Sequence, residues 1–445
     1  MIIQLSIKNY RSFKDNSILS LVATNYDKDT REEENIILDE KYKLRLLKSA
    51  VVYGANAGGK SKFIEALIFM RQFILSSSKD SQKGEPIGVE PFRLNSETIK
   101  LGSEFEIIFT LNSERYRYGF EVNSEKIIAE WLFHKPKTKE IELFYRDYQD
   151  ITTKIPKANL LIKEGLIRDN ALFLSVLAQF NDKTAESILE WFKAITAISG
   201  LQEEGYLHDT MQMTKDKIQK ERILTFLKNA DIGIDDFKLK KHIYEDVDDK
   251  SEQFDDEFKN VLKGVNSYVN RLLKEKGVEE RFSDVITFHK QFDETGKFQS
   301  TIEFSLKEDE SSGTRKFFAL IGLILKTIDN GSVLFVDELD AKLHPNLVCK
   351  IVSFFNSKKL NSKNAQLIFN THDTNLLSSG LFRRDQIWFT QKDKYGATKL
   401  YSLADFKTDE VRKNEAFEDN YIRGKYGAVP FLGDFEDIIH TLTKT

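Results

Sequence analysis

Cysteine is almost absent from this sequence: Cys349 is the only one among 445 residues. A single cysteine excludes an intramolecular disulfide framework and any zinc site built from several cysteines. Because Cys349 lies in the apolar pattern that follows His344 and Pro345, we interpret it as a small core residue rather than a reactive thiol.

Long apolar runs are also missing. The longest, residues 317–325, is far shorter than the ~20 residues that a membrane-spanning helix needs. Residues 2–7 alternate like a strand and lack the apolar core of a signal peptide. We therefore expect a cytoplasmic protein that makes no membrane contact.

Neither sign of charge dominates the composition. Lysine and arginine number 66, aspartate and glutamate 70, and the formal net charge is −4. The molecule as a whole therefore does not attract nucleic acid electrostatically, although a local basic face remains open. Hydrophobic residues make up 40% and charged residues 31%, as in soluble globular proteins. The length allows two or three domains.

Strand patterns dominate the first part of the chain, residues 1–153. β-Branched and aromatic residues recur there, often with period two, and the expected strands are residues 2–7, 48–53, 103–111, 115–122, 126–134 and 142–146. Polar turns at Asn112 and Asn123 predict that residues 103–134 form an antiparallel meander. One helix, residues 62–75, is apolar on almost every side, so we expect it to be buried.

Helical patterns replace the strands in residues 154–283. Apolar residues recur there at spacings of three and four, and the expected helices are residues 170–180, 184–199, 211–229 and 255–276. We interpret this stretch as a helical domain inserted between two halves of another domain.

Strands return in residues 284–445, now alternating with helices. The expected strands are residues 284–290, 299–306, 332–336, 366–370, 386–390 and 399–403, with helices at 313–327 and 345–356. This alternation predicts an α/β fold whose sheet is covered by helices. We expect strands 48–53, 332–336 and 366–370 to lie side by side in this sheet. Together with the antiparallel meander expected for residues 103–134, this predicts a mixed sheet.

The most specific motif is residues 54–61, which match the P-loop pattern G-x-x-x-x-G-K-[ST]. The glycines Gly54, Gly58 and Gly59 permit backbone angles that turn N–H groups inward, and Asn56 belongs to the same loop. The motif follows an apolar strand and opens a helix, whose N-terminus also attracts an anion. It therefore predicts an ATP site.

Charged and hydroxyl side chains complete this predicted site. Lys60 would bind the β- and γ-phosphates, and the Ser61 hydroxyl would ligate Mg²⁺. Residues 333–336 form an apolar strand that ends in Asp337 and Glu338, at the edge where open α/β sheets bind ligands. Asp337 would hold Mg²⁺, and Glu338 would act as the general base toward water.

Three shorter motifs accompany these two. Residues 311–314, Ser-Ser-Gly-Thr, open a helix and are either a phosphate-binding helix terminus or an ordinary N-cap. Asp340 lies just beyond Glu338, before Leu343-His344-Pro345. His372 follows strand 366–370, from which it could reach a γ-phosphate.

In this order, the motifs resemble those of ABC-type, AAA-family ATPases of the Rad50/SMC/RecF group. Residues 7–13, Ile-Lys-Asn-Tyr-Arg-Ser-Phe, are similar to the first strand and turn of that group. The chain looks most like single-chain ATPases of bacterial anti-phage systems: the RloA/AbiL type, the PtuA and AriA ATPases and the ATPase part of OLD proteins. Residues 423–430 resemble the RloA-like tail.

The resemblance implies a head-to-tail homodimer, or a higher oligomer, with ATP between the subunits. Ser312 and Gly313 would meet the γ-phosphate of the partner's ATP, and Asp340 would cross the interface near it. His372 would complete the switch in its own site. The chain lacks a clear glutamine for the γ-phosphate-sensing loop, and residues 90–94 are the candidate replacement. It also lacks the nuclease domain that follows the ATPase in OLD proteins.

These features favour an ATPase that senses a signal and regulates a separate, co-encoded effector, a nuclease, in phage defence. The helical insertion would contact this partner. Its basic residues either contact DNA or form a solvated face: Lys215, Lys217, Lys220, Arg222, Lys228, Lys238, Lys240 and Lys241. The alternatives are a RecF- or Rad50-like DNA repair ATPase and an assembly scaffold that binds ATP with little turnover.

Overall fold

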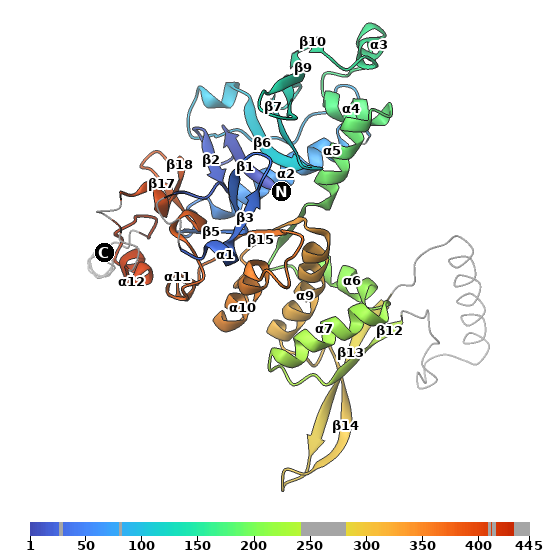
Figure 1. The fold of residues 1–445 in the computed structure, drawn as a ribbon, viewed down its shortest axis with the longest axis vertical. Coiled ribbons are helices and arrows are strands. Elements are labelled where there is room, and N and C mark those ends of the chain that lie inside the picture. The colour runs from blue at the N-terminus through green and yellow to red at the C-terminus, as the bar shows by residue number, and fades with distance from the viewer. Residues whose placement is uncertain (26–29, 80–81, 242–281, 408–410, 412–414, 431–445) are drawn as a thin grey trace, which may run out of the picture. The chain divides into compact units, whose positions relative to one another are not determined.

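The computed structural model describes residues 1–25, 30–79, 82–241, 282–407, 411 and 415–430 (Figure 1). The chain forms two compact units, unit 1 with Met1–Leu201 and Lys326–Thr445, and unit 2 with Gln202–Leu325. These limits differ from the expected domain limits at residues 153 and 283. Residues 154–201 of the expected insertion belong to unit 1, and residues 284–325 belong to unit 2.

A six-stranded sheet in unit 1 contains the strands beside which the predicted motifs lie. Its order is β11-β15-β16-β5-β17-β18. The strands are β5 (Ser49–Gly54), β11 (Thr196–Ser199), β15 (Val333–Asp337), β16 (Gln366–Asn370), β17 (Ile387–Lys392) and β18 (Thr398–Ser402). β11, β15, β16, β5 and β17 run parallel, and β18 is antiparallel. The predicted neighbours β15, β16 and β5 are confirmed, so their carboxyl ends meet at one edge.

Two helices follow strands of this sheet as predicted. Helix α2 (Lys60–Ser76) begins two positions before the expected residue 62 and packs against β5 and β15. Its fully buried residues lie on one half of the helix and most of the others are half-buried, so the predicted burial holds for one half of its surface. Helix α10 (Pro345–Asn356) has proline in its first turn, where the missing N–H costs nothing.

A seven-stranded antiparallel sheet, also in unit 1, has the order β10-β9-β8-β7-β6-β1-β2. The strands are β1 (Ile2–Lys8), β2 (Ser17–Ser20), β6 (Ser103–Leu111), β7 (Glu114–Val122), β8 (Ile127–Lys135), β9 (Ile141–Asp147) and β10 (Asp150–Thr153). The predicted meander is confirmed. Asn112 and Ser113, with φ of 51° and 59°, form the tight turn between β6 and β7 that hairpin twist favours.

Smaller elements complete unit 1. A two-stranded sheet pairs β3 with β4, and short helices lie between the strands. These elements are α1 (Glu32–Asn35), β3 (Ile36–Asp39), β4 (Leu44–Leu47), α3 (Ala158–Lys163), α4 (Phe173–Gln179), α5 (Lys183–Ala194), α11 (Asn375–Ser378) and α12 (Phe417–Ile422). In the described ranges, no helix of either unit is both long and apolar enough to cross a membrane.

The expected helix 184–199 is wrong at its end. Helix α5 stops at Ala194, and Thr196–Ser199 form β11, which pairs with β15. Apolar residues at Ile195 and Ile198 fit either a helix or a strand. Pairing with the edge of β15 stabilises the strand. The backbone N–H of Gly200 then donates to the Asp337 carbonyl at 2.6 Å, which ties this segment to the end of β15.

Unit 2 contains more strand than the sequence indicated. Its three-stranded sheet pairs β12 (Asp236–Lys241), which was not predicted, with β13 (Phe282–Phe292) and β14 (Phe298–Ser305). The expected helix 211–229 is two helices, α6 (Glu204–Met213) and α7 (Lys217–Asn229). They separate at Asp216, whose side chain caps α7. The expected helix 255–276 lies outside the described residues.

Helix α9 (Ser312–Asn330) begins in unit 2 and packs on this sheet. The rings of Phe237 on β12 and Phe318 on α9 meet edge to face at 5.1 Å. The Thr210 hydroxyl donates to the Ala319 carbonyl at 2.5 Å, which also fastens α6 to α9. Helix α9 covers the predicted range 313–327 and extends beyond it at both ends.

Candidate functional site

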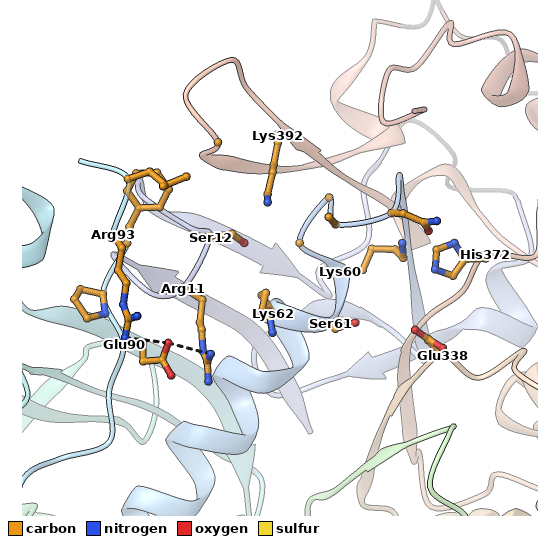
Figure 2. Close-up of a pocket in the computed structure, with 18 residues that line it drawn as sticks. Arg11, Ser12, Lys60, Ser61, Lys62, Glu90, Arg93, Glu338, His372 and Lys392 are labelled. Atoms are coloured by element: carbon orange, nitrogen blue, oxygen red, sulfur yellow. Dashed lines mark ion pairs between the residues drawn. The ribbon is translucent and has the colours of Figure 1, made fainter. Parts of the chain in front are cut away.

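One cavity of about 550 Å³ in unit 1 brings most of the predicted site residues together. Its wall includes Asn56, Gly58, Gly59, Lys60, Ser61, Glu338 and His372 (Figure 2). Gly54 ends β5 directly before this loop, and Asp337 ends β15 directly before Glu338. Ser312 and Gly313 begin α9 in unit 2, so their role at a partner's phosphate stays a prediction.

The loop between β5 and α2 owes its shape to close contacts with strand β17 and with β18. A Cβ added to Gly54 would lie 2.4 Å from the Thr390 hydroxyl oxygen, so only glycine fits. Gly59 has a φ of 110°, and Ala57 a φ of 59°, both in the left-handed region. The loop therefore turns tightly in front of α2.

The start of α2 leaves its N–H groups available. Its N-cap residue is Gly59, which has no side chain with which to cap them. The first N–H groups of a helix have no partner within the helix and carry the positive end of its dipole. This arrangement suits an anion held in the loop.

Lys60 lies in the wall of the cavity and is nearly buried, with 6% of its surface exposed. Its Nζ donates to the carbonyl oxygens of Gly54 and Ala55, at 2.9 and 3.3 Å. Burial lowers the pKa of this amine from its ordinary value, and the nearby Glu338 and Asp337 carboxylates oppose that shift. A phosphate bound here would supply the negative charge that favours the ammonium form.

The acidic side of the cavity is built from the ends of β15 and β16. Glu338 has a φ of 55°, which is unusual for a residue with a side chain. Its backbone N–H donates at 2.6 Å to the side-chain oxygen of Asn370, and the Asn370 amide nitrogen donates to Asp337. Sequence reasoning missed Asn370, because it looks like the last residue of an apolar strand.

His372 and Asp340 contact each other within one chain. His372 is exposed and lines the cavity, while its backbone N–H donates to the Asp340 carboxylate at 3.2 Å. The other oxygen of that carboxylate is buried and has no hydrogen-bond partner among the described residues. Asp340 does not belong to the cavity wall, so its predicted place at a subunit interface stays a prediction.

The other side of the cavity is basic. Arg11, Lys62, Arg93 and Lys392 join Lys60 in the wall, against the acids Glu90 and Glu338. Sequence reasoning did not single out Arg11 and Lys392. Arg11 lies in the motif of residues 7–13, but Lys392, at the end of β17, belongs to no motif.

Residues 90–94 also line the cavity, but at a distance from its acidic side. Glu90 pairs with Arg11 at 3.0 Å and with Arg93 at 3.5 Å. Figure 2 shows Arg11, Glu90 and Arg93 on one side of Lys60, and Glu338 and His372 on the other. The segment considered for γ-phosphate sensing thus lies apart from the residues expected at that phosphate.

The donor set fits a nucleoside triphosphate with a divalent cation. Basic side chains outnumber acids in the wall, and Ser12 adds a buried hydroxyl oxygen without a hydrogen-bond partner among the described residues. The described residues contain no group of three or more His, Cys, Asp or Glu side chains able to hold a metal ion. A cation held by Ser61 and Asp337 would need phosphate oxygens as further ligands, as Mg²⁺ in nucleotide sites does.

A comparison with protein families agrees with this geometry. The family model described as “AAA domain, putative AbiEii toxin, Type IV TA system” matches residues 49–378, which is most of the chain. The match includes the P-loop, the Asp337–Glu338 pair and His372. No curated protein matches the chain.

Proposed function

Because the chain belongs to this AAA domain family of ATPases, we propose that it binds ATP with Mg²⁺ and hydrolyses it in the cavity of unit 1. One observation carries the proposal. The P-loop residues Lys60 and Ser61 share a cavity with Glu338, an acid at the carboxyl end of a parallel strand. The groups that we propose to bind phosphate and to activate water therefore line the same cavity.

Each side chain has a defined task in this proposal. The N–H groups at the start of α2 and the Lys60 ammonium would hold the phosphates, while Ser61 and Asp337 would hold the cation. Mg²⁺, when bound, would withdraw charge from the β- and γ-phosphate oxygens. Glu338 orients the attacking water and accepts its proton. His372, exposed at the cavity wall, would contact the γ-phosphate.

Glu338→Gln is the direct test. The amide cannot accept the proton, so we expect ATP turnover to fall by about 100-fold or more while ATP affinity is retained. Lys60→Ala should instead weaken ATP binding itself. The control is Glu97→Gln, which changes a glutamate whose side chain is 74% exposed. Slow turnover that Glu338→Gln leaves unchanged would favour the assembly scaffold.

We also propose that each ATP-binding site is completed by residues of a second subunit. Support comes from Ser312 and Gly313, which lie at the start of the long helix α9 and are not among the residues that line the cavity of unit 1. Mixing two inactive variants tests this. Lys60→Ala subunits keep an intact Ser312, and Ser312→Arg subunits keep an intact P-loop, so a mixed dimer contains one complete site.

A mixed dimer has one complete site of two, so we expect it to recover up to about half of the activity of a wild-type dimer. Only the fraction of the mixture that consists of mixed dimers should show this activity. Each variant alone should be inactive. If Ser312→Arg alone hydrolyses ATP like the wild type, or mixing restores nothing although mixed dimers form, the shared site is wrong.

As its biological role, we propose that the ATPase regulates a separate effector, a nuclease, in a phage-defence system. The family description, which names a toxin of a toxin–antitoxin system, supports this class of role. The test co-expresses the chain with the product of its neighbouring gene and measures phage plaques with wild type and Glu338→Gln. Protection that needs both proteins and intact Glu338 supports it.

DNA repair remains the second candidate, with weaker support. Lys220 pairs with Asp236 at 3.1 Å and Lys238 with Glu303 at 2.6 Å, so part of the basic surface in unit 2 is already neutralised. Hydrolysis strongly stimulated by DNA, without any protein partner, would favour this candidate over the effector model.

A further inference from the structure

We infer that Asn370 is a positioning residue that sets the geometry of the two acids proposed to hold the cation and activate water. The inference rests on the proposed ATPase function, because it concerns the same site. Asn370 ends β16, is fully buried and lies beside the end of β15. It does not line the cavity, so it would act through Asp337 and Glu338.

The hydrogen bonds fix which way the Asn370 amide faces. The Glu338 backbone N–H can only donate, so the atom that accepts from it at 2.6 Å must be the Asn370 oxygen. The amide nitrogen consequently faces the Asp337 carboxylate and donates to it. One planar group therefore spans the backbone of one acid and the side chain of the other.

A third contact closes the arrangement. The Leu339 backbone N–H donates at 3.2 Å to the main-chain carbonyl of Asn370. Residues 337, 338 and 339 are thus each bound to Asn370, two of them through its side chain. The chain leaves β15 here as a tight turn rather than as a continued strand.

This turn explains the unusual backbone of Glu338. A φ of 55° is disfavoured for a residue with a Cβ and persists only where the surroundings impose it. The bond from its N–H to Asn370 is such a constraint. It aims the Glu338 side chain into the cavity, where it faces His372 and Lys60 (Figure 2).

The Asp337 carboxylate is constrained in a different way. One of its oxygens accepts from Asn370, which limits rotation of the carboxylate and leaves the other oxygen for the cation. Small displacements of catalytic groups cost large factors in rate. Asn370 therefore matters to hydrolysis without touching the nucleotide.

The test is a double-mutant cycle between Asn370 and Glu338. In the wild-type background, we expect Asn370→Ala to lower kcat by about 10- to 100-fold and to change the KM for ATP by less than about threefold. In the Glu338→Gln background, Asn370→Ala should lower the residual rate by a clearly smaller factor than in the wild type, because the effect through Glu338 is already lost and only the effect through Asp337 remains.

Asn361→Ala is the matched control. Asn361 is equally buried and its side chain makes three hydrogen bonds to the backbone of Phe355 and Ala365, away from the cavity. Its loss should lower the thermal midpoint but not kcat below that midpoint. If Asn370→Ala behaves in the same way, Asn370 is merely structural and the inference is overturned.

Asn370→Asp keeps the test usable if the alanine variant does not fold. The aspartate has the same shape and still accepts from the Glu338 N–H, but it cannot donate to Asp337 and adds a second negative charge. We expect a loss of kcat, and full activity would overturn the inference. If Glu338→Gln itself leaves turnover unchanged, the proposed ATPase function is wrong. If Glu338→Gln is inactive but Asn370→Ala is fully active, the proposed function holds and only the inference about Asn370 is overturned.

Discussion

The hydroxyl of Thr398 donates a hydrogen bond of 3.1 Å to the carbonyl oxygen of Gly58. Thr398 begins strand β18, whereas Gly58 belongs to the loop that precedes α2. The Thr398 backbone N–H also donates to the Ser12 carbonyl at 2.7 Å. A late strand of the chain thus supports the phosphate-binding loop and the turn beside it.

Thr398→Val should weaken nucleotide binding. Valine keeps the shape of threonine but leaves the buried Gly58 carbonyl without this donor, at a cost of about 1 kcal/mol, or about fivefold in affinity if the bound state bears it. Titration with a fluorescent ATP analogue measures the change. Thr152→Val, which removes a hydroxyl of hairpin strand β10, is the control, and equal affinities for both variants would contradict the prediction.

Gly54→Ala should disrupt the loop and the sheet together. The new Cβ would lie 2.4 Å from the Thr390 hydroxyl oxygen and 2.5 Å from the Thr390 carbonyl oxygen, and the strand backbone cannot easily retreat. We expect a loss of stability of about 1–3 kcal/mol and loss of ATP binding, measured by thermal unfolding with and without ATP. Gly88→Ala is the control, since a Cβ there meets nothing within 4 Å.

At alkaline pH, the binding of ATP should be accompanied by uptake of a proton at the Lys60 amine. Burial lowers the pKa of this amine below 10.5, and bound phosphates would raise it again. As pH rises toward the lowered pKa, free protein loses the proton that the complex retains, so affinity falls with pH and uptake increases. Calorimetry in two buffers of different ionisation enthalpy, at about pH 7 and about pH 9, measures this linkage.

A Lys60→Arg variant separates Lys60 from other groups in that experiment. Arginine stays charged throughout this pH range, so any complex it forms should show no such uptake. Equal proton uptake in the wild type and the arginine variant would show that another group is responsible.

Lys48→Met should stabilise the protein at neutral pH. Burial lowers the pKa of Lys48 from 10.5 to about 8, so the unfolded chain binds more protons between these values, and wild-type stability rises with pH there. Below pH 8 the folded protein carries a buried charge. We expect the free energy of unfolding of the variant to be about 1 kcal/mol higher than that of the wild type at pH 7. Its stability should not rise with pH between about 8 and 10.5, and denaturant unfolding measures both effects.

The control for that prediction is Lys183→Met, at a lysine whose side chain is 87% exposed. Its exposed ion pair contributes little to stability, so the unfolding free energy should stay close to that of the wild type. A destabilised Lys48→Met would mean that its hydrogen bond to the Asn356 carbonyl outweighs the cost of burial.

The sequence predicted the strands and helices whose patterns arise from burial. Strand β5 and helix α2 were recognisable because an apolar strand, a glycine-rich loop and an apolar helix follow one another. The meander of β6, β7 and β8 was recognisable from alternation and turn residues. In each case the local pattern and the final packing agree.

The parts that were missed depend on partners far away in sequence. Residues 196–199 became β11 because the edge of β15 was open, and residues 236–241 became β12 because β13 lay beside them. Asn370 is the clearest example at the site. Its importance rests on hydrogen bonds to residues 337 and 338, which no pattern within strand 366–370 indicates.

The order of the strands in the six-stranded sheet also has a consequence for synthesis. Strand β5 (Ser49–Gly54) lies between β16 and β17, both made more than three hundred residues later. While the ribosome completes the chain, both edges of this apolar strand lack their final neighbours. Exposed apolar edges invite aggregation and slow folding. We therefore expect the nascent chain to depend on chaperones until residues 366–392 emerge.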